Sequence, residues 1–142
     1  MYKKRYILIL ILIIAPLIAY LPTIWNDFLY YWDDQWQVTN KYTSGGFIWG
    51  NVSSIFSEFL EGQYSPVNQM MYLLIYTLFG YDPAAFHIAS LILHIFNTLF
   101  IFFIINKLLY LSKTSEKINI NIVAFVAALL FAVHPINVES TA

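Results

Sequence analysis

An uncharged run near the amino terminus limits what this chain can fold into more than any other feature. Residues 6–24 carry no charge and follow the basic cluster Lys3-Lys4-Arg5. As a helix this run would be roughly 28 Å long, which is enough to cross a bilayer. A cleaved signal peptide also has a basic start, but its apolar core is usually about 7–15 residues long and ends at a small-residue site. The bulky segment Ala19-Tyr20-Leu21-Pro22 therefore favours a retained anchor.

The composition places the whole chain in a membrane. Of its 142 residues, 60% are hydrophobic and 11% are charged, whereas soluble domains have about 45–50% apolar and about 25% charged residues. We therefore expect an all-α integral membrane protein. The net charge of −1 provides no basic field, so no nucleic-acid partner is expected. The absence of cysteine excludes disulfides, thiolate catalysis and zinc–thiolate sites.

Residues 25–83 are polar and aromatic, and we interpret them as a large outer loop with six acidic residues and one basic residue. Apolar residues at helical spacing near 47–61 predict an amphipathic helix, which lies on the membrane surface or packs on the rest of the loop. A second helix is expected over 66–79, because Ser65 can cap it, Pro66 suits its first turn and Gly80 ends it. At roughly 21 Å this helix is too short to cross, so we expect it to dip into the interface.

Two further apolar segments predict a second span over 84–106 and a third over 118–134, after which 135–142 begins a second outer loop. The polar residues of the second span share one helix face, which we expect to contact other helices rather than lipid. They are His87, Ser90, His94 and Asn97. The two histidines would lie roughly 10 Å apart along the axis, which argues against a metal site between them.

The basic residues predict the orientation of these three spans. Six of the seven fall on one side of the membrane: Lys3, Lys4, Arg5, Lys107, Lys113 and Lys117. Because cytoplasmic loops are rich in Lys and Arg, we expect a cytoplasmic amino terminus and a loop 25–83 that lies outside. The first and third spans then run in the same direction. The segments 32–34 and 134–139 are therefore expected on one membrane face.

Two adjacent carboxylates, Asp33 and Asp34, are the main candidates for chemistry. They lie in the aromatic run 28–40 close to the first span, where charge beside apolar material is costly. Adjacent side chains point in different directions, so we expect one acid to be chemical and the other to hold the loop. The chemical one could accept a proton from a hydroxyl or bind a divalent cation. The alternative is a solvated turn without a catalytic role.

Several motifs occur in a fixed order over nearly the whole chain. They are Asn26-Asp27-Phe28, Trp32-Asp33-Asp34, Val38-Thr39-Asn40, Gly62-Gln63-Tyr64-Ser65-Pro66-Val67, Leu78-Phe79-Gly80-Tyr81-Asp82-Pro83, Phe86-His87, Leu93-His94 and the segment 127–140 around His134-Pro135. Together they resemble the amino-terminal part of bacterial-type multi-span membrane proteins with carboxy-terminal tetratricopeptide repeats. Those proteins are related to the protein O-mannosyltransferases, which have the C-type glycosyltransferase fold.

The resemblance implies a membrane glycosyltransferase that moves a sugar from a polyprenyl-phosphate donor to a hydroxyl of a protein or glycan. Asp33 and Asp34 match the acidic motif of its first outer loop, and Asp33 is the first choice for the base or a metal contact. The candidate substrate-binding residues are Trp32, His87, His134 and Glu139, of which the last two match the second outer loop. Gln35 stands where relatives often carry a third acid, which leaves one carboxylate fewer for a divalent cation.

The resemblance also implies a place and partners. The expected location is a bacterial inner membrane, with membrane lipid, the sugar donor and the acceptor as partners. Related enzymes have many more spans, so the chain is expected to be a fragment that is inactive alone. The alternative is a non-catalytic membrane scaffold that anchors the repeats for protein interaction. A transporter is less favoured, because the acids lie in a loop rather than at mid-membrane.

Overall fold

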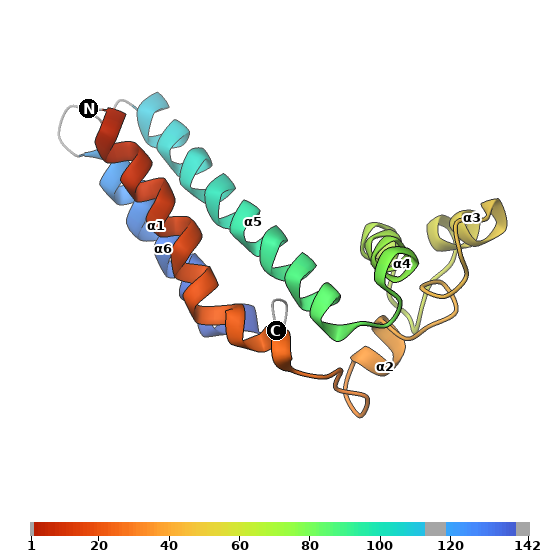
Figure 1. Ribbon diagram of the computed structural model, residues 1–142. Coiled ribbons are helices and arrows are strands. Elements are labelled where there is room, and N and C mark those ends of the chain that lie inside the picture. Colours follow the sequence, from red (N-terminus) through yellow and green to blue (C-terminus); the bar gives the residue numbers. More distant parts are fainter. Residues whose placement is uncertain (1, 113–118, 139–142) are drawn as a thin grey trace. The chain divides into compact units, whose positions relative to one another are not determined.

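The computed structural model describes residues 2–112 and 119–138, with side chains from residue 5 onward, and this part of the chain is helical without a β-strand (Figure 1). It divides into two compact units, which are described separately. We call Met1–Ile24 with His87–Ala142 the three-helix unit and Trp25–Phe86 the loop unit. The all-α expectation is confirmed for the described residues. The C-type glycosyltransferase fold stays a prediction.

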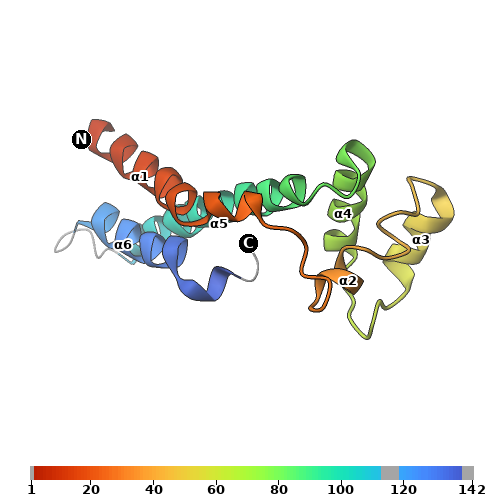
Figure 2. The ribbon, with the colours of Figure 1, turned by 60° about the horizontal axis from the view of Figure 1, so that its bottom comes forward.

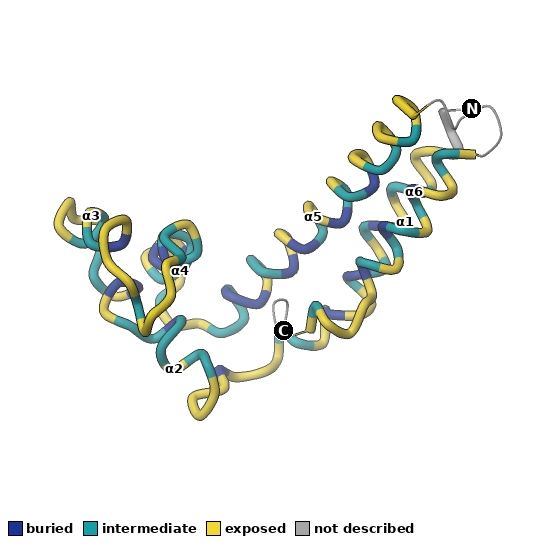
Figure 3. Tube along the Cα trace, turned by 180° about the vertical axis from the view of Figure 1, so that it is seen from behind, coloured by how far each residue is buried: buried dark blue, intermediate teal, exposed yellow. Residues whose placement is uncertain are grey.

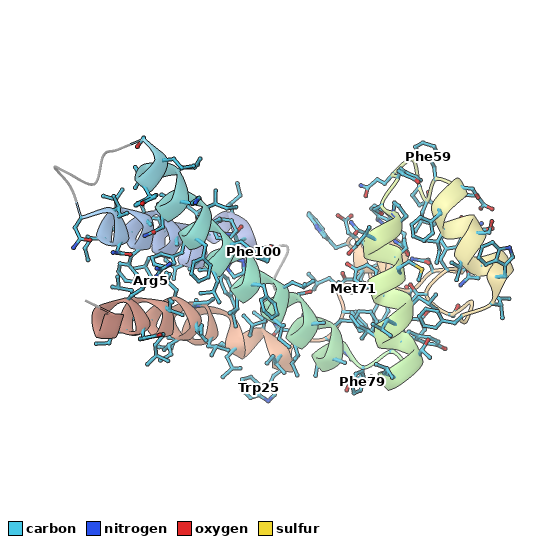
Figure 4. The ribbon with its side chains drawn as sticks, turned by 90° about the horizontal axis from the view of Figure 1, so that it is seen from above. Arg5, Trp25, Phe59, Met71, Phe79 and Phe100 are labelled. Carbon is cyan, nitrogen blue, oxygen red and sulfur yellow. The ribbon has the colours of Figure 1, made fainter. Side chains whose placement is uncertain are left out.

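The three-helix unit contains α1 (Tyr2–Tyr20), most of α5 (Pro83–Leu111) and α6 (Ile120–Val133). The Arg5 guanidinium lies 5.7 Å from the Phe103 ring centroid, so the start of α1 lies beside the end of α5 (Figure 4). The Tyr20 hydroxyl donates to the His134 carbonyl at 3.0 Å, which brings the ends of α1 and α6 together. α1 and α6 therefore run in the same direction and α5 runs in the opposite one (Figure 2).

Alanines allow α6 to pack closely against its neighbours. Every fourth residue of one α6 face is a fully buried alanine: Ala124, Ala128 and Ala132. Leu12 of α1 and Phe102 of α5 are fully buried in the same apolar core as the first two of these alanines. Small side chains permit this close approach of helices, which is how helices gain packing energy where no water is available to drive association.

Two helices are long and apolar enough to cross a membrane, over Arg5–Trp25 and Pro83–Leu111. Only 17% and 22% of their apolar windows are buried inside the protein, so most of this apolar surface needs another cover, and hydrocarbon provides one. This supports membrane association. α6 has 14 residues and is roughly 21 Å long, so the third span over 118–134 stays a prediction. Lys113 and Lys117 lie outside the described residues.

The polar face of α5 differs from the expected one at a single position. His87 and His94 are buried, as expected, and His94 Nε2 lies 2.9 Å from the Ala132 carbonyl oxygen of α6. Asn97 was expected on the same face but is exposed, and Thr98 is buried instead. At about 100° per residue, Asn97 is rotated roughly 80° from His87, whereas Thr98 is rotated only about 20°.

The loop unit contains α2 (Asp34–Gln37), α3 (Trp49–Ser57) and α4 (Pro66–Phe79). Tyr42, Ile55 and Leu73 form its buried apolar cluster, which joins α3 to α4. α4 has the bounds expected from the sequence, and it ends at Gly80, whose φ of 66° suits glycine. Ser65 precedes α4 but makes no side-chain cap bond, contrary to the expectation.

α3 is shorter than the helix expected over 47–61. It ends at Ser57, because the Glu58 backbone is extended and its carboxylate accepts hydrogen bonds from the Tyr42 hydroxyl at 2.6 Å and from Lys41 Nζ at 3.1 Å. Ile55 is buried against α4, so α3 packs within the loop, which was one of the two alternatives. Phe59, beyond the end of α3, is exposed (Figure 4).

Candidate active-site loop

Asp34 stabilises the loop that carries the acidic pair through two hydrogen bonds. Its Oδ2 accepts a hydrogen bond from the Leu29 backbone N–H at 2.8 Å, and its carbonyl accepts one from the Val38 N–H at 3.1 Å. Phe28, the residue before Leu29, is buried, and its ring centroid lies 5.4 Å from that of Phe86. The Asp34 carboxylate is therefore tied to an anchored segment of chain and has a structural task.

Asp33 is tied less closely. Its Oδ1 accepts a hydrogen bond from Trp36 Nε1 at 3.2 Å, and its side chain does not cap α2. Its carbonyl accepts the Gln37 N–H at 2.8 Å, so the backbone at this position is fixed. A carboxylate can accept about four hydrogen bonds. Oδ2 of this half-buried side chain accepts none from the described residues and is free for a ligand.

Exposed aromatic side chains precede the acidic pair. Trp32 is 66% exposed and Tyr31 is fully exposed, although the Trp32 backbone N–H is held by the Leu29 carbonyl at 2.9 Å. The fixed backbone thus presents large amphipathic rings beside Asp33. Such rings offer a flat apolar face together with a polar edge, which suits contact with a partly apolar ligand.

Asn40 joins the acidic loop to α4, a role that no local sequence pattern indicates. Its Nδ2 donates to the carbonyls of Trp36 and Gln37 and to Gln69 Oε1, at 3.0, 2.7 and 3.1 Å. Its Oδ1 accepts from the backbone N–H groups of Tyr42 and Thr43 at 2.9 and 3.1 Å. Gln69 is 4% exposed, so this contact fixes α2 against a buried position of α4.

Tyr72 lies one turn further along the same face of α4. Its ring centroid is 5.7 Å from that of Phe86, the ring that also contacts Phe28 beneath the acidic loop. Burial raises the pKa of the Tyr72 hydroxyl above its ordinary value, the hydrogen bond with Asn68 lowers it, and the charge of Asp34 raises it. Gln69 and Tyr72 therefore lie on the face of α4 that is turned toward the loop that bears the acids.

A second polar cluster surrounds Glu58, away from the acidic pair in sequence. The hydrogen bond from Tyr42, together with contacts of Ser54 and Lys41, lowers the pKa of Glu58 from 4.5 to about 2. Burial raises the pKa of the Tyr42 hydroxyl, and the bond to Glu58 acts in the same direction. This cluster ties α3 to the segment after α2, so its role is structural. Sequence spacing alone did not indicate it.

The other expected site residues belong to the three-helix unit. His87 is buried, and His134 is exposed with Nδ1 accepting the Ile136 backbone N–H at 3.2 Å, so that Nε2 carries the proton of the neutral ring. Glu139 lies outside the described residues. Trp32, Asp33 and Asp34 come together in the loop unit. Their convergence with His87 and His134 stays a prediction.

A divalent cation at the acidic pair would have few protein ligands. Among residues 2–112 and 119–138, no group of three or more His, Cys, Asp or Glu side chains is placed to hold a metal ion. Mg²⁺ and Ca²⁺ take six or more oxygen ligands. The described side chains therefore do not form a metal site by themselves, and we derive no step through a cation.

Comparison with known proteins shows similarity to two mannosyl-transferases. A protein O-mannosyl-transferase of Caenorhabditis elegans is 31% identical over 94% of this chain. The human protein O-mannosyl-transferase TMTC1 is 28% identical over 90% of this chain. The chain spans 19% of the length of the first and 14% of the second. No protein-family profile and no solved structure matches the chain.

These similarities show a relation to O-mannosyl-transferases over nearly the whole chain. Both relatives are animal proteins, so they lend no support to the expectation of a bacterial chain. Neither comparison concerns tetratricopeptide repeats, which stay a prediction.

Proposed function

We propose that this chain is the amino-terminal part of a membrane glycosyltransferase. It would transfer a sugar from a polyprenyl-phosphate donor to a hydroxyl of a protein or glycan on the non-cytoplasmic face of a membrane. The observation that carries the proposal is the 31% identity to a protein O-mannosyl-transferase over 94% of the chain. The fixed acidic loop supports it, because it offers a carboxylate with one free oxygen beside exposed aromatic rings.

In the proposed reaction, the acceptor oxygen attacks the anomeric carbon of the sugar. The bond between that carbon and the phosphate oxygen breaks, and the polyprenyl phosphate leaves with the bonding electrons. The proton of the acceptor hydroxyl passes to a carboxylate, which is general-base catalysis. We assign this role to Asp33, since its Oδ2 is free, whereas Asp34 Oδ2 holds the Leu29 N–H at 2.8 Å.

A transfer assay on membranes that contain the complete reading frame tests this assignment. We expect Asp33→Asn to lower turnover about 10²-fold to 10⁴-fold, because an amide cannot accept the proton. The variant keeps an oxygen for Trp36 Nε1, so the loop should stay folded. Asp27→Asn is the matched control, since Asp27 is an exposed acid of the same unit. Equal turnover of Asp33→Asn and the control would refute the assignment.

A non-catalytic membrane scaffold is the second candidate. The observation that favours it is that both acids bind groups of their own loop, Trp36 Nε1 and the Leu29 N–H, which gives them a structural reason to be present. A scaffold predicts full complementation by the double variant Asp33→Asn with Asp34→Asn in cells that lack the protein. The transferase predicts failure of the double variant at wild-type protein levels.

A further inference from the structure

Side chains from both other helices of the three-helix unit hold the end of α6. The Tyr20 hydroxyl, at the end of α1, donates to the His134 carbonyl at 3.0 Å, and His94 Nε2 of α5 lies 2.9 Å from the Ala132 carbonyl oxygen. The rings of Tyr20 and His94 also meet edge to face, with centroids 5.3 Å apart. Figure 3 shows buried segments recurring along one side of α5, and His94 is among the buried residues of this helix. Two buried polar side chains therefore act on the same short segment.

These contacts satisfy carbonyl groups that α6 itself leaves unpaired. The last four carbonyls of an α-helix have no partner within the helix, and an unpaired carbonyl is costly where water is scarce. The Phe131 carbonyl accepts from Asn137 Nδ2 at 2.7 Å, and the Ala132 carbonyl lies beside His94. Because a carbonyl oxygen can only accept, His94 Nε2 carries a proton and donates. His94 is thus a buried donor with a defined partner on α6.

The backbone and the ring of His134 are fixed by the same segment. Its carbonyl accepts from the Tyr20 hydroxyl and from the Asn137 backbone N–H at 3.0 Å, and its own N–H donates to the Phe131 carbonyl at 3.3 Å. The Ile136 N–H donates to the Nδ1 atom of the His134 ring at 3.2 Å. Since Nδ1 accepts, the proton of the neutral ring is on Nε2. His134 therefore presents a hydrogen-bond donor of fixed direction, which suits an anionic oxygen.

We propose that Tyr20 and His94 are positioning residues, which hold the end of α6 so that His134 Nε2–H donates to the phosphate of the sugar donor. This role rests on the proposed transferase function. The phosphodiester of a polyprenyl-phosphate sugar carries one negative charge before the reaction, so the hydrogen bond forms already in the bound substrate. Tyr20 and His94 act through the backbone at Ala132 and His134 and do not touch the donor.

Hydrogen exchange of the complete protein, followed by mass spectrometry, tests whether the two side chains hold this segment. Tyr20→Phe and His94→Leu each remove one donor, and each should raise the exchange rate of the amides in 134–138 about fivefold to tenfold. Thr98→Val is the matched control, because Thr98 is a fully buried residue of α5 whose hydroxyl has no hydrogen-bond partner among the described residues. Equal exchange in the control and in both variants would refute the positioning role.

The transfer assay tests the role toward the sugar donor. Tyr20→Phe should raise the KM for the donor about threefold to tenfold with kcat nearly unchanged, because a contact made in the bound substrate is weakened. His94→Leu should act in the same direction. His94→Gln keeps an N–H donor and should recover part of the affinity. A mere loss of folded protein would instead lower the maximal rate at an unchanged KM.

A double-mutant cycle distinguishes positioning of His134 from an unrelated structural effect. His134→Ala removes the imidazole, so Tyr20→Phe should cause no further rise in KM in that background. An equal rise in that background, or an unchanged KM in Tyr20→Phe alone, would overturn this proposal and leave the transferase function standing. If the wild-type protein transferred no sugar, the proposed function would fail and the role toward the donor with it.

Discussion

The two units of this protein are stabilised by different kinds of contact. In the loop unit, a few polar side chains bind backbone groups from several segments, as Asn40 does with Gln37, Gln69 and Thr43. In the three-helix unit, apolar packing fills the middle. It also has interhelical hydrogen bonds, such as Asn106 Nδ2 to Asn121 Oδ1 at 2.9 Å and the contact of His94 Nε2 with the Ala132 carbonyl oxygen at 2.9 Å.

This difference indicates what each unit can tolerate. A loop without regular structure must satisfy its backbone groups through side chains, so the loss of one amide leaves several buried groups unpaired. Close-packed helices depend on volume, so an added methyl group matters more than a lost polar atom. The loop unit should thus be sensitive to polar substitutions and the three-helix unit to changes of size.

The tryptophans allow the two units to be followed separately. All four belong to the loop unit: Trp25, Trp32, Trp36 and Trp49. Intrinsic tryptophan fluorescence therefore reports on the loop unit, whereas far-UV circular dichroism reports on the helices of both.

The largest effect is expected at Asn40. Asn40→Ala should lower the free energy of unfolding of the loop unit by about 2–4 kcal/mol, because Oε1 of the buried Gln69 and the backbone N–H groups of Tyr42 and Thr43 lose the partner that Asn40 provides. Urea denaturation followed by tryptophan fluorescence measures this. Asn40→Asp keeps the acceptor and loses the donors, so it should fall between Ala and wild type. Gln35→Ala, at an exposed neighbouring position, should be nearly neutral; an equal loss there would refute the role of Asn40.

A smaller effect is expected from a change of size in α6. Ala128 is fully buried in the core that contains Leu12 and Phe102. Ala128→Leu should destabilise the three-helix unit by about 1–3 kcal/mol, because the larger side chain forces the helices apart. Unfolding in detergent followed by circular dichroism measures it, while the fluorescence transition of the loop unit should not change. Val126→Leu, on an exposed position of the same helix, is the control and should have little effect.

Local signals in the sequence predicted some features well. Pro66 and Gly80 mark the ends of α4, because proline suits the first turn of a helix and glycine adopts the positive φ found after its end. The two long helices follow from uninterrupted apolar runs. Such signals lie within a few residues of the structure that they determine. Of the acidic pair expected in a loop, Asp33 lies in a turn, whereas Asp34 is the first residue of the short helix α2.

Contacts between distant residues could not be predicted in this way. Asn40 and Gln69 are 29 residues apart, and nothing in either local sequence indicates their hydrogen bond. The end of α3 is set by the Tyr42 and Glu58 contact, which also joins separate segments. The exposure of Asn97 rather than Thr98 depends on the rotation of α5 against its neighbours, which a polar spacing alone does not fix.

The smallest expected effect is a pH dependence of the loop unit. The folded pKa of Glu58 is about 2, below its ordinary value of 4.5, so its charged form stabilises the folded loop. That contribution is complete above about pH 4.5 and is lost as the pH falls through about 2. The loop unit should therefore unfold at lower urea concentration as the solution is acidified through this range, and Glu58→Gln should flatten the dependence.

Two further variants distinguish the contribution of Glu58 to this pH dependence from the contributions of other carboxylates. Tyr42→Phe removes the hydroxyl that donates to Glu58 at 2.6 Å, the first cause of the low pKa, and should weaken the pH dependence without abolishing it, since Lys41 remains at 3.1 Å. Glu61→Gln, at an exposed position close by, should leave the dependence intact. If Glu58→Gln and wild type lost stability in parallel, the pH response would belong to other carboxylates. The stability of the loop unit would then depend on the hydrogen bonds of Asn40 and Gln69 and not on the charge of Glu58. In this respect the loop unit would resemble the three-helix unit, whose apolar core is uncharged.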